Sequence, residues 1–289
     1  MKGTPRFPPG DDAAPVVLKI GGEAIDAAEP GRALWRALSE LHAELAGGLV
    51  VVHGGGAVVD ARLARLGMVS EKRDGLRVTP PQHMEEIVAS LAGVVNAGLV
   101  GKLRREGAPA VGLTLGDGGA SWGIPVVRST DLGFDPGRVG RVAAVQEVDH
   151  GLLLRVLVRA RFMPVVCSIG LDDAGEPLNV NADDAAEGIA TLLDASALVL
   201  LTDVRGILDA RGELVREIDP AGIERLIDSG VIRSGMATKA RSAARAATVG
   251  GRPVVIASWK HPAELVGLSG RGGAGTRVVI EHPDCGART

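Results

Sequence analysis

Short runs of β-branched and other apolar residues recur along this chain, and segments with helical periodicity separate them. In one such segment, Leu34, Leu38, Leu41 and Leu45 lie three or four residues apart, which places them on one face of a helix. Strands that are apolar throughout are typical of a parallel sheet buried on both faces. The alternation therefore predicts an α/β fold, a three-layer αβα sandwich with a mainly parallel central sheet. The six predicted strands are residues 16–20, 49–53, 110–115, 164–169, 197–202 and 253–258.

Local signals add helix starts and hairpins to this pattern. Thr79 precedes two prolines and a glutamine, and Asp219 precedes a proline, so both residues are predicted as N-caps. The polar stretches at 67–78 and 122–147 suit hairpins or lids at the strand ends.

Composition and charge exclude several function classes. The 289 residues are 46% hydrophobic and carry a net charge of -3, so they can form a buried core but give no basic field for nucleic acid. No apolar run reaches the length of a membrane span, and no signal peptide is evident. We expect a cytoplasmic protein that binds neither nucleic acid nor membrane, with a flexible leader over residues 1–15, a folded part over 16–281 and a tail over 282–289.

Cysteines and histidines are too sparse to suggest a metal site. The two cysteines, Cys167 and Cys285, fit a reducing compartment rather than a disulfide framework. The six histidines lack the short spacings of zinc ligands. We therefore expect no metal held by the protein alone.

Glycine turns follow the first two predicted strands. Gly21 and Gly22 end the first strand, and Gly54, Gly55 and Gly56 lead from the second strand into a helix. Glycines let backbone N–H groups approach an anion, and a helix N-terminus attracts one, so phosphate is the ligand these turns suit. Neither turn matches the P-loop or the dinucleotide fingerprint. A tight strand-to-helix turn without a ligand remains the alternative.

Two lysines and a cluster of amides and carboxylates stand beside such turns. Lys19 lies within an apolar strand, and Lys239 lies near the start of an alanine-rich helix. A buried ammonium must be paired, so the two lysines could brace nucleotide phosphates, although Lys19 could also simply reach water. Residues 178–184 (LNVNADD) precede a helix. Besides capping it, their carboxylates could hold both lysines and their amides could bind a polar substrate.

One arginine and one loop complete the candidates. Arg77 lies directly before a predicted helix, where it suits bidentate capture of a carboxylate, with a surface arginine as the alternative. Residues 201–208 follow a buried strand, as expected of a loop that contacts a nucleotide.

In this order the motifs resemble the amino acid kinase family and, within it, the enzymes that phosphorylate N-acetyl-L-glutamate in bacterial arginine synthesis. The resemblance covers roughly residues 16 to 280. The matching stretches are VVLKIGG, VVHGGGAVVD, DGLRVT, AVGLTLGDG, PVVCSIG, LNVNADDAA, LVLLTDVRGILD, SGMATK, RPVVIASWKH and GAGTRVV.

The resemblance implies a sandwich with two lobes, an N-lobe over about 16–172 that binds the acyl amino acid and forms a homodimer, and a C-lobe over about 173–281 that binds ATP with Mg²⁺. Lys19 and Lys239 would stabilise the phosphoryl group in transfer, and Asp183 would orient both lysines. The implied substrate-binding residues are Gly22, Gly55, Gly56, Arg77, Asn179 and Asn181. The implied nucleotide contacts are Asp203, Val204, Arg205, Gly206, Ile207 and Leu208 in one segment and Val231, Ile232 and Arg233 in a second.

The resemblance further implies transfer to the γ-carboxylate of N-acetyl-L-glutamate, which is already ionised and needs no general base. N-acetyl-aminoadipate and a carrier-bound glutamate or aminoadipate remain alternative acceptors, and a catalytically silent effector-binding protein is the alternative from another class. Ser234 stands where an acidic residue or a glycine is common in the family, and Arg233 falls in the implied nucleotide segment, so both could alter nucleotide affinity without affecting the lysines. The leader lacks the N-terminal helix of arginine-inhibited hexamers, so we expect a dimer without strong arginine feedback.

Overall fold

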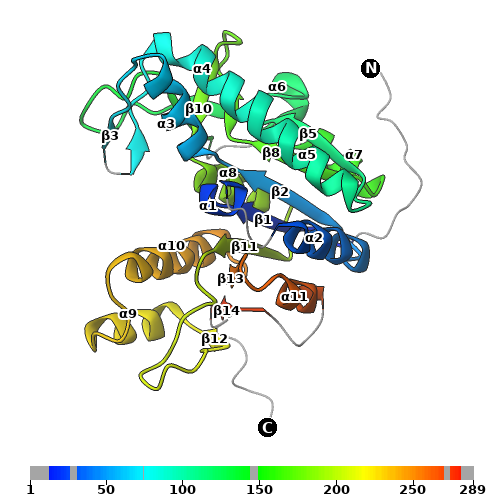
Figure 1. The fold of residues 1–289 in the computed structure, drawn as a ribbon, viewed down its shortest axis with the longest axis vertical. Helices are drawn as coiled ribbons and strands as arrows, with labels where there is room; N and C mark the ends of the chain where they lie inside the picture. Colours follow the sequence, from blue (N-terminus) through cyan, green and yellow to red (C-terminus); the bar gives the residue numbers. More distant parts are fainter. Residues whose placement is uncertain (1–12, 27–30, 74, 144–148, 270–273, 281–289) are drawn as a thin grey trace.

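The computed structural model describes residues 13–26, 31–73, 75–143, 149–269 and 274–280. Its central sheet consists of β1 (Val16–Ile20), β2 (Leu49–His53), β5 (Ala110–Thr114), β8 (Met163–Cys167), β11 (Ala197–Thr202), β12 (Glu217–Ile218), β13 (Val254–Ser258) and β14 (Thr276–Val278). The strand order is β12-β14-β13-β11-β1-β2-β8-β5, and Figure 1 shows it running from four strands of residues 197–278 to four strands of residues 16–167. All neighbours are parallel except β13 and β14.

All six predicted strands are present, with ends that differ by at most two residues from the prediction. β1 is the middle of the sheet, because it pairs in parallel with both β2 and β11. The predicted α/β sandwich with a mainly parallel sheet is confirmed.

Helices cover both faces of the sheet, because alternate strand residues point to opposite sides. On one face Leu18 packs in the same core as Leu38, and on the other face Val17 packs in the same core as Ile189. The first face is covered by α2 (Arg32–Glu44), α5 (Asn96–Arg105) and α11 (Pro262–Leu265), which a 3₁₀ turn (Val266–Ser269) extends. The second is covered by α7 (Leu152–Arg159), α8 (Ala182–Leu192) and α10 (Ser234–Gly250), with α9 (Pro220–Asp228) packed on α10.

Smaller elements surround the carboxyl edge of the sheet. They are α1 (Gly22–Asp26), α3 (Gly56–Arg65), α6 (Gly119–Trp122), the hairpin of β3 (Lys72–Arg73) and β4 (Leu76–Arg77), and a four-stranded sheet of β6 (Val126–Arg128), β7 (Val139–Val142), β10 (Pro177–Val180) and β9 (Ile169–Leu171). The hairpins predicted in 67–78 and 122–147 are thus the antiparallel pairs β3–β4 and β6–β7.

One predicted helix start is confirmed and the other is wrong. The Asp219 carboxylate accepts a hydrogen bond from the Gly222 N–H and caps α9. Thr79 instead is buried and pairs with Gly137, and its hydroxyl donates to the Arg77 carbonyl. Because Thr79 forms this β-bridge, it does not cap the helix, and the helix begins at Pro81.

That helix is continuous from Pro81 to Arg105. It consists of a 3₁₀ turn (Pro81–His83), α4 (Met84–Val88), a π-helical segment (Ala89–Val95) and α5. By length and mean hydropathy (1.4) it is the one described helix that could cross a membrane, although the sequence predicted no span. Its inner face packs on the sheet through Leu99 and Leu103, as in a core helix. Only 39% of its apolar 18-residue stretch is buried.

Several predictions of organisation lie outside the described residues or remain predictions. Residues 1–12 of the expected leader and residues 282–289 of the expected tail, with Cys285, are not among the described residues. The boundary at about residue 172 between the two lobes stays a prediction.

Asn96 joins the long helix to the sheet. Its buried amide nitrogen donates to the Val165 carbonyl (2.8 Å) and lies 3.0 Å from His53 Nε2. Gly112 of β5 makes room for it, because a Cβ there would lie 2.1 Å from Asn96 Oδ1. The contact therefore requires a residue without a side chain at position 112.

We predict that Gly112→Ala lowers the free energy of unfolding by about 1–3 kcal/mol, because the added methyl displaces the Asn96 side chain. Asn96→Ala should cost a similar amount by leaving buried polar atoms without their partner. In the double variant the Gly112→Ala loss should shrink, since the clashing atom is gone. Urea unfolding of the three variants measures this, and strictly additive losses would contradict the contact.

Candidate active site

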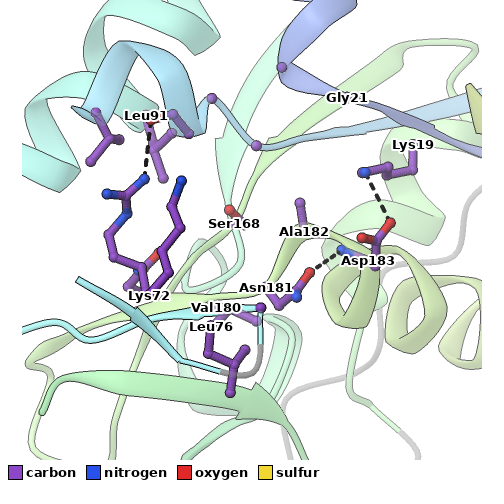
Figure 2. Close-up of a pocket in the computed structure, with 18 of the residues that line it drawn as sticks. Lys19, Gly21, Lys72, Leu76, Leu91, Ser168, Val180, Asn181, Ala182 and Asp183 are labelled. Carbon is purple, nitrogen blue, oxygen red and sulfur yellow. Dashed lines mark hydrogen bonds and ion pairs between the residues drawn. The ribbon is translucent and has the colours of Figure 1, made fainter. Parts of the chain in front are cut away.

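A cavity of about 320 Å³ opens at the carboxyl ends of β1 and β2 (Figure 2). Parallel strands place their carboxyl ends, and the loops that follow them, at one edge, where open α/β sheets bind ligands. The lining includes Lys19, Gly21, Gly22, Gly54, Gly55, Gly56, Lys72, Arg77, Ser168, Asn179, Asn181 and Asp183. Every predicted substrate-binding residue and two of the three predicted catalytic residues thus meet in one cavity.

The two glycine turns form the floor of this cavity. A Cβ on Gly22 would lie 3.8 Å from the Gly56 nitrogen, so the turns are in close proximity. Gly55 has a φ of +157°, and a Cβ there would lie 2.9 Å from Leu91 Cδ2. Position 55 therefore requires glycine for both its conformation and its space. The resulting surface is lined by backbone N–H groups at the start of α3, which suits a phosphoryl group.

His53 stabilises the second glycine turn, residues 54–56. It is fully buried at the end of β2, and burial lowers its pKa to about 4. Asn96 donates to Nε2, so Nδ1 carries the proton and donates to the Gly54 carbonyl at 2.7 Å. A neutral imidazole with both nitrogens satisfied is a structural support for the turn, and no proton transfer is assigned to it.

Lys19 forms an ion pair with Asp183, with Nζ and Oδ1 3.0 Å apart. Lys19 is one residue from the end of β1, and Asp183 lies in the first turn of α8. Asn181 caps that helix by accepting from the Asp183 N–H at 2.8 Å, and Figure 2 shows this pair beside the Lys19 contact. The cap that was one of the sequence alternatives is thus present, and it holds Asp183 toward the lysine.

The opposite end of the cavity is also cationic. Figure 2 places Lys72 across the cavity from Lys19, and Arg77, the strand partner of Lys72, also lines the cavity. Asn179 lies nearby and uses one amide proton to donate to Thr79 Oγ1 at 3.1 Å. Sequence reasoning missed Lys72, although the basic pair at 72–73 in the predicted hairpin was a usable signal.

A second cavity, of about 440 Å³, is formed by the predicted nucleotide segments. It is lined by Val204, Arg205, Gly206, Leu208, Val231, Ile232, Arg233 and Met236. Two predicted contacts do not line it. Ile207 is fully buried, its N–H donating to Thr276 Oγ1, and Asp203 pairs with a lysine. The two segments, more than 20 residues apart, thus form one pocket.

That lysine is Lys239, the third predicted catalytic residue. Its Nζ lies 2.5 Å from Asp203 Oδ1, so it does not line the first cavity. The expectation that Asp183 orients both lysines is therefore wrong for this structure, where each lysine has its own aspartate. The Lys239 ammonium, despite burial of the carboxyl, lowers the pKa of Asp203.

The arrangement suits transfer of an anionic group. Two ammonium groups, the glycine turns and two cavities beyond the ends of the neighbouring strands β1 and β11 can hold anions and stabilise charge that builds up during transfer. Among the described residues, no group of three or more His, Cys, Asp or Glu side chains is placed to hold a metal ion.

Known proteins are similar to this chain over most of its length. Residues 14–258 match the sequence profile of the amino acid kinase family. The chain is 42% identical to the acetylglutamate kinase of Aeromonas salmonicida, covering 93% of this chain and all of the relative, and 39% identical to that of Vibrio cholerae serotype O1, covering 92% and 97%. A solved structure, smu.665 from Streptococcus mutans, superposes with a TM-score of 0.70 at 27% identity, covering 92% of this chain and 99% of that one.

The neutral state of His53 predicts a pH dependence of stability. Its pKa in the folded state, about 4, lies below the ordinary value of 6.5, so the unfolded chain binds the proton first as the pH falls. The free energy of unfolding should therefore decrease by about 1.4 kcal/mol more between about pH 7.5 and 5.5 in the wild type than in His53→Gln. Urea unfolding at the two pH values tests this, and equal slopes would show that His53 is not buried as a neutral group.

Proposed function

The chain belongs to the amino acid kinase family, and we propose that it transfers the γ-phosphoryl group of ATP to the γ-carboxylate of N-acetyl-L-glutamate. The product is N-acetyl-L-glutamyl 5-phosphate, and the reaction is a step of arginine biosynthesis. Relatives named acetylglutamate kinase match nearly the whole chain at about 40% identity, which supports a carboxyl-group kinase.

The observation that carries the proposal is the distribution of charge in the first cavity. N-acetyl-L-glutamate has a carboxylate at each end. Lys72 lies across the cavity from Lys19, and Arg77 is beside Lys72 as its strand partner and through their shared contact with Asp60. The α-carboxylate suits the arginine, which can bind it in a bidentate way. The γ-carboxylate then lies near Lys19 and the glycine floor, where the phosphoryl group arrives.

In the reaction, a γ-carboxylate oxygen attacks the γ-phosphorus of ATP. The P–O bond to the β-phosphate breaks, and ADP leaves with that electron pair. The carboxylate is ionised at neutral pH, so no side chain has to remove a proton. Lys19 and Lys239 stabilise the charge on the transferring group, and Asp183 and Asp203 hold the two ammonium groups in place.

We propose that the nucleotide occupies the second cavity, formed by the 203–208 and 231–233 segments. Arg205 donates two hydrogen bonds to Glu264, from Nη2 to Oε1 at 2.6 Å and from Nε to Oε2 at 3.2 Å. Magnesium enters as part of the MgATP substrate, with phosphate oxygens and water as its main ligands. Asp203, in the first of these segments, is engaged by Lys239.

We also propose a homodimer formed through the outer face of the helix from Pro81 to Arg105. Val94 is 60% exposed on this face, and Gly93, Ala97 and Gly101 are exposed beside it. Small residues at intervals of four let two helices approach closely, and a second copy would cover the apolar surface. A dimer interface would explain the exposed apolar face without requiring that the helix cross a membrane.

A buried, free Cys167 fits the reducing cytoplasm, where we place the protein.

The experiment that tests the activity is acyl-phosphate formation with MgATP, trapped as a hydroxamate. N-acetyl-L-glutamate, N-acetyl-L-aminoadipate and free L-glutamate are compared in parallel. A signal selective for N-acetyl-L-glutamate is expected. Selectivity for aminoadipate would replace the substrate, and no signal with any of them would favour a carrier-bound acceptor or a silent binder, which ATP binding would distinguish.

We predict that Lys19→Ala and Lys239→Ala each lower kcat by about 10²- to 10⁴-fold, because each removes a cation that stabilises the transferring phosphoryl group. Lys102→Ala is the matched control, since Lys102 lies on α5 and lines neither cavity. Steady-state kinetics with circular dichroism checks all three. Normal turnover in either site variant would overturn the roles assigned to the lysines.

The dimer predicts a mass of twice the 29.6 kDa chain in light scattering. Val94→Glu should yield monomers, because it places a charge in the apolar interface. Val249→Glu, at a 70% exposed position on α10, is the control and should remain dimeric. A hexamer, or a dimer that survives Val94→Glu, would contradict the interface.

A further inference from the structure

The β3–β4 hairpin carries two cations in an unfavourable arrangement. Lys72 and Arg77 are direct partners in the two-residue antiparallel ladder. Like charges opposite each other destabilise a strand pair, and an isolated two-stranded hairpin is marginal in water. The hairpin must therefore be held in place by something outside itself.

Asp60, in the middle of α3, supplies the missing charge. Its Oδ2 lies 3.0 Å from Lys72 Nζ, and its Oδ1 accepts a hydrogen bond from Arg77 Nη1. Burial would raise the pKa of this carboxyl, but hydrogen bonds from Arg77, Lys72 and Ser70 outweigh it and keep the pKa well below its usual range. Asp60 is thus a permanent anion that binds both strands of the hairpin to one helix.

The same contacts determine where the two cations point. Arg77 Nη2 donates to the Gly56 carbonyl at 3.1 Å, at the start of α3. The Arg77 side chain is only 9% exposed, while that of Lys72 is 54% exposed. Both residues line the first cavity, and Asp60 does not. Asp60 therefore does not contact a ligand in this cavity directly, whereas its two partners can.

We propose that Asp60 is a positioning residue of the acyl amino acid site, which holds the β3–β4 hairpin against α3 and directs Arg77 and Lys72 toward the substrate's α-carboxylate. The proposal rests on the function proposed above and extends it from the residues that touch the substrate to the one that places them. It also gives Lys72 a role as the second cation at that end.

Two opposite outcomes separate positioning from simple charge balance. If Asp60 only neutralised its neighbours, its removal would leave a more positive site, which would bind an anionic substrate more tightly. If it positions them, its removal releases the hairpin, and the substrate binds more weakly. The sign of the change in KM therefore decides between the two roles.

The test is Asp60→Asn, which keeps the size of the side chain and removes its charge. We expect the KM for N-acetyl-L-glutamate to rise about 10- to 100-fold, as for loss of a charged hydrogen bond, while kcat and the KM for ATP change by less than about twofold. Glu86→Gln is the matched control, because it removes another ion pair of α3, that of Arg62, away from the hairpin. It should leave all three constants unchanged.

A double-mutant cycle gives the second readout. In an Arg77→Ala background, Asp60→Asn should have little further effect on KM if Asp60 acts through the arginine. A lowered or unchanged KM in Asp60→Asn, or effects that add fully in the double variant, would overturn the proposal.

Hydrogen exchange of the ligand-free protein tests the positioning role without depending on kinase activity. Asp60→Asn should speed exchange of the hairpin amides at residues 72–73 and 75–77, and Glu86→Gln should not. Wild-type protein without kinase activity would refute the proposed function, whereas unchanged exchange in Asp60→Asn would refute the positioning role whatever the substrate.

Discussion

The parallel pairing of β1 with both β2 and β11 is the constraint on which the site depends. In this register Lys19 lies beside Val52 on one side and Leu200 on the other, so all three strands end at the same edge. The turns at 21–22 and 54–56 and the loop at 203–208 therefore leave the sheet together. The strand order thus places the first cavity and the 203–208 loop at one edge of the sheet.

Each of the cations discussed above has a carboxylate partner at this edge. Lys19 is held by Asp183, Lys239 by Asp203, and the Lys72 and Arg77 pair by Asp60. Each carboxylate neutralises part of a positive field that would otherwise be costly to keep in one place, and it also restricts the cation to one direction. The site thus combines a positive charge for anionic substrates with the order that charge stabilisation requires.

Most of the central sheet and part of the candidate site could be predicted from the sequence. Apolar runs identified the six long strands because buried parallel strands tolerate few polar residues, and the motifs identified Lys19, Arg77, Asn179 and Asp183 as neighbours. It failed where pairing across the fold decides the outcome. Thr79 joins a β-bridge instead of a cap, and Lys239 meets Asp203 rather than Asp183. The contact between Lys72 and Asp60 was missed because it depends on how a short hairpin folds onto α3, which local patterns do not encode.

The central claim is that the two cavities are the two halves of one reaction centre. A crystal structure with N-acetyl-L-glutamate and a non-hydrolysable ATP analogue tests it most directly. We expect the amino acid between Arg77 and Lys19, the nucleotide between the 203–208 and 231–233 segments, and the ammonium groups of Lys19 and Lys239 both within hydrogen-bonding distance of the γ-phosphoryl group. A nucleotide bound elsewhere, or a γ-phosphoryl group that reaches neither lysine, would contradict the account.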